Sequence, residues 1–226
     1  MPNMPNYALK WDESGERYYE TGVKMGVLYP VVSGAYPKGV VWNGLTSVSE
    51  TPSGGDANNI YADDIKYLSL RAAEEFGATV EAYTYPDEFA VCDGSASVAD
   101  GVTIGQQTRK PFGLCYRTIV GNDIDMNDHA YKLHLIYNAT ASPSERQYQT
   151  VNDSPEAITF SWEMTTTAVA VNGYKPTACI TIDSRKADAT KLAALEQILY
   201  GTPAGDGTAA VDARLPMPDE VISMMA

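Results

Sequence analysis

The chain has 226 residues, 44% of them hydrophobic, and its formal net charge is −13. This length and hydrophobic content suit one all-β domain with a core and exclude a wholly disordered chain. A surface that binds nucleic acid through phosphates needs excess Lys and Arg, whereas here 29 acidic residues oppose 16 basic ones. The acidic balance favours a protein that stays soluble before any assembly.

The sequence has no signal that directs it out of a cytoplasm. The N-terminal residues lack the basic and then apolar layout of a signal peptide, and no apolar run is long enough for a membrane helix. Cys92, Cys115 and Cys179 are odd in number and include no CxxC pair, which predicts free thiols. We therefore expect a protein made in a cytoplasm, with no membrane partner.

The predicted elements are mostly strands, because Tyr and Thr are frequent and apolar residues alternate with polar ones. At 131–137 the odd-numbered residues are apolar or aromatic, and at 159–165 the even-numbered ones are. Two sheets packed face to face, or a barrel, would bury such stripes. In chain order, strands are expected at 23–32, 40–48, 60–70, 78–85, 112–120, 131–137, 159–165 and 177–183.

Two segments interrupt or follow these strands in the first half of the chain. Residues 43–59 end in a run of Ser, Gly, Asp and Asn, which predicts a long loop, and loops of this length are usually functional or disordered. Pro86, followed by Asp87 and Glu88, has the composition of a first helical turn and predicts one or two turns ending near Gly94.

The C-terminal part combines one helix with an arm. Asp188 is the expected N-cap of a helix through Tyr200, which Gly201 ends and which packs on the outside of a sheet. Residues 202–213 form a linker, and the apolar tail beyond it docks either on its own domain or on a neighbouring subunit. We expect a β domain over 1–200 and a linker with a C-terminal arm over 201–226. The apolar face of the helix is Leu192, Leu195, Ile198 and Leu199.

No catalytic motif stands out, which predicts a protein without enzymatic activity, cofactor or metal. His129 and His134 point to opposite faces of a strand and cannot share a metal. Residues 123–127 copy the start of a calcium loop, but Asp128 and His134 replace the required Gly and Glu, so an ordinary polar turn is expected.

Carboxylate pairs and aromatic residues also have simple explanations. Neighbouring carboxylates such as Asp63 and Asp64 would point to opposite sides of a strand and do not form a glycosidase pair. Tyr83, Tyr85 and Phe89 are expected to pack in the core rather than to form a platform for sugars.

Taken together, several runs in order along the chain resemble the major tail (tail tube) proteins of long-tailed bacteriophages that infect Gram-positive bacteria. The similarity covers nearly the whole chain, although no single run is a catalytic motif. The runs are 11–17, YETGVKMGVLYP, VVWNGLTSVSETPSGGD, NIYADDIKYL, TVEAYTYPDEFAVCDG, GQQTRKPFGLCYRT, YKLHLIYNATASPSE, TVNDSPEAITFSWEMTT and LPMPDE.

This resemblance implies a tail-tube fold: a β-sandwich or barrel-like core with one flanking α-helix, a long loop at 43–59 and a C-terminal arm. The subunits would form hexameric rings that stack into a non-contractile tube in the virion tail, after assembly in the bacterial host cytoplasm. Tape-measure, tail terminator and distal tail proteins would be partners. The expected subunit contacts are Glu50, Thr51, Pro52, Ser53, Asp56, Asn58, Asn59, Leu215, Pro216, Met217 and Pro218.

The resemblance also gives the acidic composition a mechanical role. A lumen lined with carboxylates would repel the DNA backbone and let the duplex pass without binding. Three alternatives remain open: the tube subunit of a phage-derived tailocin, a carbohydrate-binding or adhesin-like β-sandwich, and a carboxylate hydrolase on a β scaffold.

Overall fold

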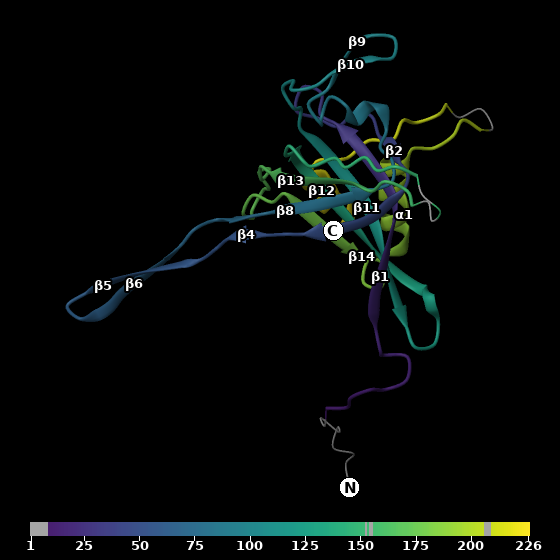
Figure 1. The fold of residues 1–226 in the computed structure, drawn as a ribbon. Helices are drawn as coiled ribbons and strands as arrows, with labels where there is room; N and C mark the ends of the chain where they lie inside the picture. The colour runs from purple at the N-terminus through teal and green to yellow at the C-terminus, as the bar shows by residue number, and fades with distance from the viewer. Residues whose placement is uncertain (1–8, 152, 154–155, 206–208) are drawn as a thin grey trace.

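The computed structural model describes residues 9–151, 153, 156–205 and 209–226, and these residues form a mainly β fold with antiparallel sheets. Small parts of the expected β domain (1–8, 152, 154–155) and of the expected linker (206–208) lie outside the described residues. Figure 1 shows a central body from which a long hairpin projects on one side, with the N-terminal segment leaving at the bottom.

The body is built on one eight-stranded sheet. The strand order is β2-β1-β11-β12-β13-β8-β3, and β14 pairs with β12 beside this path. The strands are β1 (Tyr19–Pro30), β2 (Val40–Trp42), β3 (Leu45–Glu50), β8 (Gly77–Ala82), β11 (Phe112–Asn122), β12 (Met126–Ala141), β13 (Phe160–Thr166) and β14 (Cys179–Asp183).

The sheet curves until its two ends meet. A Cβ atom on Gly26 of β1 would lie 2.4 Å from Cδ1 of Leu45 in β3, so the strands approach closely where glycine leaves room. The curved sheet encloses one core cluster, in which the Trp42 ring lies 4.6 Å from the tilted ring of Phe89 and 5.5 Å from the edge-on ring of Trp162, measured between centroids. The sequence did not distinguish a β-sandwich from a barrel, and the structure shows that the body has a single curved sheet.

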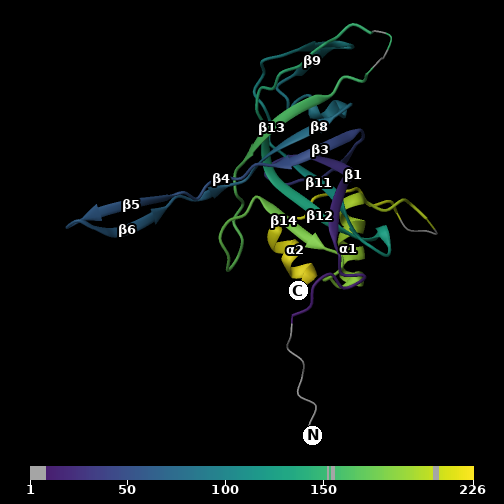
Figure 2. The same ribbon diagram turned by 60° about the horizontal axis from the view of Figure 1, so that its bottom comes forward.

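The outer face of the sheet is covered by two helices, α1 (Ala189–Tyr200) and α2 (Pro218–Met225) (Figure 2). Successive side chains of β12 point alternately to the enclosed core and to the face that the helices cover. Leu133, Leu135 and Tyr137 point toward the helices, and the intervening Ile136 points into the enclosed core. The strand predicted at 131–137 is confirmed, but it is buried on both faces rather than on its odd-numbered side alone, because His134 and Ile136 are buried too. One flanking helix was expected, and two form.

The helix predicted after Asp188 is confirmed in position and in packing. The Asp188 carboxylate accepts hydrogen bonds from the backbone N–H groups of Thr190 and Lys191, at 2.9 and 3.0 Å. Gly201 ends the helix with a φ of 74°. Three of the four predicted apolar residues are buried against the sheet, and Ile198 is half-buried.

Three predictions in the first half of the chain were wrong. Segment 40–48 is two strands, because Asn43 and Gly44 interrupt it. Segment 60–70 is two strands joined by a turn, and 43–59 is not a loop but one side of a long hairpin. The one or two helical turns expected after Pro86 are present as a 3-10 helix, Asp87–Phe89, followed by turns as far as Gly94, which has a φ of 78°. Further short strands are β4 (Ser53–Gly54), β5 (Ala57–Ala62), β6 (Ile65–Arg71), β7 (Glu74–Glu75), β9 (Ala96–Ala99) and β10 (Val102–Ile104).

Candidate assembly surface

The most prominent feature outside the body is the hairpin arm, which we define as residues 50–77, where the chain continues beyond β3 and returns to β8. Its two sides continue the antiparallel pairing of β3 with β8, β4 with β7, and β5 with β6 at the distal end (Figure 1). Asp63 and Asp64 form the tip with φ of 51° and 59°, as a two-residue hairpin turn requires. They were expected in a strand, and the turn places them together at the tip instead.

The distal part of the arm has one apolar face. The pairing sets Ile60 opposite Leu68, Ala62 opposite Ile65, and Leu70 opposite Asn58, so these side chains share a face. The large members of this apolar face of the arm (Ile60, Ile65, Leu68 and Leu70) are between 37% and 62% exposed. An isolated two-stranded hairpin is marginally stable in water, and a contiguous apolar surface marks an interaction site.

The predicted contact residues of the first half of the chain all lie on this arm. Thr51, at its base, donates a backbone hydrogen bond of 2.8 Å to the carbonyl of Gly77 across the hairpin. The other predicted residues are also exposed, which is compatible with subunit contact and does not test it: Glu50, Pro52, Ser53, Asp56, Asn58 and Asn59. Sequence reasoning missed the apolar face, although alternation in 65–71 was its visible signal.

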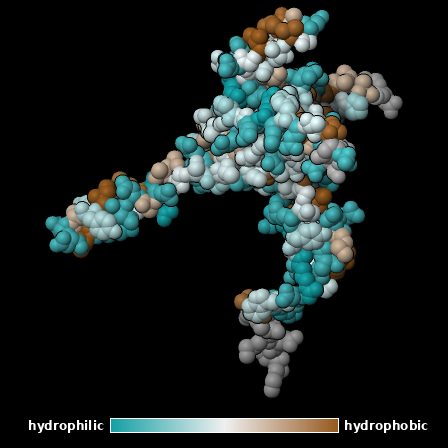
Figure 3. Space-filling view, in the orientation of Figure 1, coloured by the Kyte–Doolittle hydropathy of each residue, from teal (hydrophilic) through white to brown (hydrophobic). Residues whose placement is uncertain are grey.

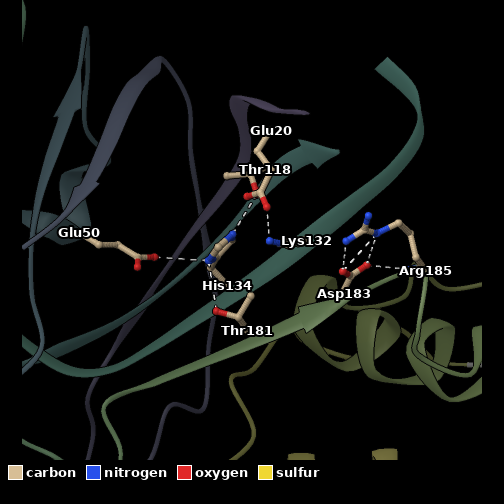
Figure 4. Close-up of polar contacts among 8 residues, drawn as sticks. All are labelled: Glu20, Glu50, Thr118, Lys132, His134, Thr181, Asp183 and Arg185. Atoms are coloured by element: carbon tan, nitrogen blue, oxygen red, sulfur yellow. Dashed lines mark hydrogen bonds and ion pairs between the residues drawn. The ribbon is translucent and has the colours of Figure 1, made fainter. Parts of the chain in front are cut away.

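A polar cluster fixes the base of the arm to the body (Figure 4). The Tyr116 hydroxyl donates to Oε1 of Glu50 at 3.0 Å, and the His134 ring stacks on the Tyr116 ring with centroids 4.7 Å apart. His134 Nε2 lies 2.9 Å from the Thr118 hydroxyl, and Nδ1 lies 3.5 Å from Glu50 and from Thr181. We call Glu50, Tyr116, Thr118, His134 and Thr181 the root cluster.

The histidine of the root cluster, His134, is neutral. Burial, only partly opposed by Glu50 and Glu20, lowers the pKa of His134 below its ordinary value of 6.5, so the ring is uncharged near pH 7. The imidazole is therefore a hydrogen-bonding group between strands rather than half of an ion pair. His134 is thus a buried, hydrogen-bonded histidine.

Two ion pairs lie beside the root cluster (Figure 4). Lys132 of β12 pairs with Glu20 of β1, and Arg185 pairs with Asp183 at the end of β14. The hydrogen bonds from Arg185 lower the pKa of Asp183 to about 2. Both pairs join segments of the body, and neither presents a free charge to a ligand.

The C-terminal arm docks on its own domain. Leu215, Pro216 and Pro218 are buried and Met217 is half-buried, and the Tyr137 hydroxyl donates to the Pro216 carbonyl at 3.1 Å. The sequence left docking on the same domain or on a neighbour open. Because these side chains are used inside the monomer, the C-terminal part of the predicted contact set is not a free surface.

The segment that resembled a calcium loop is a polar turn between β11 and β12. Asn122 organises it by accepting hydrogen bonds from the backbone of Ile124 and Asp125, at 3.1 and 2.6 Å. Asp123 accepts from the N–H of Gly15 at 2.9 Å, which attaches the N-terminal segment to this turn. Among the described residues no group of three or more His, Cys, Asp or Glu side chains is arranged to hold a metal.

The aromatic residues and thiols lie largely in the core. Phe89 is fully buried and packs against the half-buried Tyr85 at 6.3 Å, as expected. The expectation that Tyr83 also packs in the core was wrong, because its side chain is 53% exposed. Burial raises the pKa of the Cys92 and Cys115 thiols to about 12, and that of Cys179 to about 11. These free thiols are protonated at neutral pH and are poor nucleophiles.

A second hairpin, formed by β9 and β10, projects from the top of the body. Val98, Val102 and Ile104 are exposed on it. Figure 3 shows strongly hydrophobic residues there and at the distal end of the hairpin arm. Both projections therefore expose apolar residues, and others, such as Met25 and Val41, are exposed on the body.

Comparison with family models finds no match to this chain, and comparison with curated proteins finds no relative. Neither helix in the described part of the chain is sufficiently long and apolar to cross a bilayer. The architecture and surface chemistry therefore carry the functional argument, together with the sequence resemblance.

Proposed function

We propose that this chain is a structural subunit of a bacteriophage tail tube, which polymerises into stacked hexameric rings and forms a conduit for DNA. The observation that carries the proposal is the hairpin arm, which extends away from the body and exposes an apolar face at its distal end. A polymer needs a surface that reaches a neighbour, and an extended arm with an exposed apolar face supplies one.

The proposed assembly is head-to-tail. A surface that differs from the surface it binds makes a heterologous contact, and repetition of that contact closes into a ring or continues as a filament. The hairpin arm, the β9–β10 hairpin and the N-terminal segment leave the body in different directions (Figures 1 and 2), which supplies contacts within a ring and between rings. The tape-measure, tail terminator and distal tail proteins are the proposed partners at the ends and centre of the tube.

The DNA conduit accounts for the acidic composition. A channel rich in Asp and Glu repels the phosphates of the duplex evenly and prevents tight binding during passage. The net charge of −13 supports this part of the proposal. A tube structure in which Lys and Arg line most of the lumen would contradict it.

The test is negative-stain electron microscopy of the purified protein over a range of concentrations, with sedimentation to measure the assembled fraction. The wild type is expected to form rings or hollow tubes. Leu68→Asp with Leu70→Asp is expected to remain monomeric, because it places two charges on the apolar face of the arm. The matched control is Asn59→Asp with Ser69→Asp, a pair on the opposite face of the same hairpin, which is expected to assemble.

Failure of the wild type to assemble, combined with binding to polysaccharides on a glycan array, would instead support the carbohydrate-binding alternative. Hydrolysis of a polysaccharide that single Asp or Glu substitutions abolish would support the hydrolase alternative. A phage-derived tailocin would use the same tube, and electron microscopy of induced host lysates distinguishes it by the absence of DNA-filled heads.

A further inference from the structure

The acidic residues of this chain are unevenly distributed. Residues 21–49 contain Lys24 and Lys38 but no Asp or Glu, although the chain has 29 acidic residues. This segment includes most of β1, all of β2 and the beginning of β3. It therefore forms a weakly basic strip on an otherwise acidic protein.

The same strip exposes apolar side chains. Val41 of β2 is 64% exposed and Met25 of β1 is 46% exposed, while the adjacent Trp42 points into the core. Lys24 and Met25 are consecutive, and Lys38 precedes Val41 by three residues. We call Lys24, Met25, Lys38 and Val41 the receiving edge.

The backbone at this edge is partly open, although the N–H of Gly39, just before β2, donates to the Ala213 carbonyl at 2.7 Å. β2 is the terminal strand of the main sheet and pairs with β1 along one side. Within the described residues no strand pairs with its other side. An exposed strand edge offers N–H and C=O groups to an incoming strand, and such edges are used for β-strand addition between chains.

The distal half of the hairpin arm complements the receiving edge. Residues 56–75 contain five acidic residues and two basic ones, and Asp63 and Asp64 form the tip itself. The arm thus combines an apolar face with negative charge, and the receiving edge combines apolar side chains with positive charge. Complementary charge directs such surfaces to each other and disfavours pairing of two arms.

The two surfaces lie on opposite sides of the molecule. Figures 1 and 2 show the arm leaving the body on the side away from β1, and Figure 1 shows β2 on that far side as well. An arm that extends from one copy would therefore meet the receiving edge of the next copy when the copies follow one another in the same orientation. This arrangement is heterologous and can be repeated without limit or closed into a ring.

We propose that the apolar face of the hairpin arm docks on the receiving edge of a second copy of this chain. The proposal rests on the proposed function, because it specifies how the subunits of the polymer recognise each other. Ile60, Ile65, Leu68 and Leu70 cover Met25 and Val41, while the tip carboxylates approach Lys24 and Lys38.

The experiment is charge reversal on the receiving edge, with Lys24→Glu and Lys38→Glu combined. The concentration needed for assembly is expected to rise by at least about tenfold, because like charges then face each other. The matched control, Lys175→Glu with Lys186→Glu, changes the net charge equally at two exposed lysines outside the edge and is expected to assemble as the wild type does. Circular dichroism establishes that each variant is folded.

Mixing gives a second test. The edge variant keeps an intact arm, and the Leu68→Asp, Leu70→Asp variant keeps an intact edge, so an equimolar mixture is expected to form pairs that do not grow. A photo-reactive benzoylphenylalanine in place of Val41, in the otherwise unchanged protein, is expected to cross-link to residues 57–71 of a second copy.

The outcomes separate this inference from the proposed function. Assembly of the edge variant at wild-type concentrations, or cross-links from position 41 that miss residues 57–71, would overturn the inference and leave the tube proposal standing. A wild type that forms neither rings nor tubes but gives the expected cross-link would support the docking and count against the tube. A wild type that gives neither assembly nor cross-link would overturn both.

Discussion

The Tyr116 hydroxyl donates a hydrogen bond of 3.0 Å to Oε1 of Glu50. Glu50 is the last residue of β3, where the hairpin arm leaves the body, and Tyr116 lies in β11, in the interior of the main sheet. The contact therefore joins the base of the arm to an interior strand of the main sheet. It makes the direction of the arm depend on the body rather than on the hairpin alone.

A double-mutant cycle measures this contact. Glu50→Ala and Tyr116→Phe are each expected to lower the free energy of unfolding, and their coupling energy should be about 1 kcal/mol, a typical value for one hydrogen bond. A larger value is not expected because the Glu50 side chain is 43% exposed. Urea unfolding of the wild type, both single variants and the double variant gives the coupling, and additive effects would show that the contact contributes nothing.

His134 predicts a dependence of stability on pH. Its folded-state pKa is lowered by burial, so below the ordinary value of 6.5 the unfolded chain binds more protons than the folded one. The free energy of unfolding is therefore expected to fall as the pH decreases from about 6.5 toward the lowered folded-state pKa. Urea unfolding between pH 5 and pH 8 tests this, and His134→Gln should reduce the slope; an unchanged slope would contradict the assignment.

The cap of α1 predicts a local contribution to stability. Asp188→Ala leaves the N–H groups of Thr190 and Lys191 without their acceptor and is expected to cost about 1 kcal/mol. Asp188→Ser keeps an N-cap oxygen and should recover most of the loss. The two variants are compared by thermal unfolding, monitored by circular dichroism. Equal losses of stability would mean that the charge of Asp188, rather than its capping hydrogen bonds, is important.

The C-terminal arm is expected to be part of the folding unit. Leu215→Ala removes a side chain that is 3% exposed and packed beneath α2, and should cost about 2–5 kcal/mol. Ile222→Ala, in the same segment but 38% exposed, serves as the control and should cost well under half as much. If Leu215→Ala is as mild as its control, the arm is only loosely docked.

The turn at the arm tip predicts which substitutions it accepts. Asp63→Asn with Asp64→Gly should leave stability unchanged or higher, because Asn-Gly favours positive φ at both central positions. Asp64→Val should weaken the β5–β6 pairing, because a β-branched residue is strained at a φ of 59°. Amide hydrogen exchange of residues 57–71 measures the pairing, and equal protection in both variants would contradict the turn assignment.

Local signals in the sequence were sufficient to predict a helix with recognisable end residues and strands in which apolar and polar residues alternate. The helix after Asp188 was predicted from its cap, its apolar spacing and Gly201, which together specify a start, a face and an end. The strand at 159–165 was predicted because Trp162 and Met164 face the core while Glu163 and Thr165 are exposed, which leaves an alternating pattern in the sequence. The strand at 131–137 was predicted from a similar alternation, although both of its faces are buried. The helix α2 was missed, although Pro218, Asp219 and Glu220 form a suitable first turn.

The tertiary structure decided what depends on pairing between distant segments. Residues 43–59 have the composition of a loop, and they are strands because 65–82 lie beside them and satisfy their backbone hydrogen bonds. Both faces of the distal hairpin are exposed, so the alternation in 65–71 does not correspond to burial within the chain. The sequence by itself determined the β class, the acidic charge and the capped helix; only the fold placed an apolar acidic arm opposite a basic strand edge, because that relation depends on how the sheet curves in space.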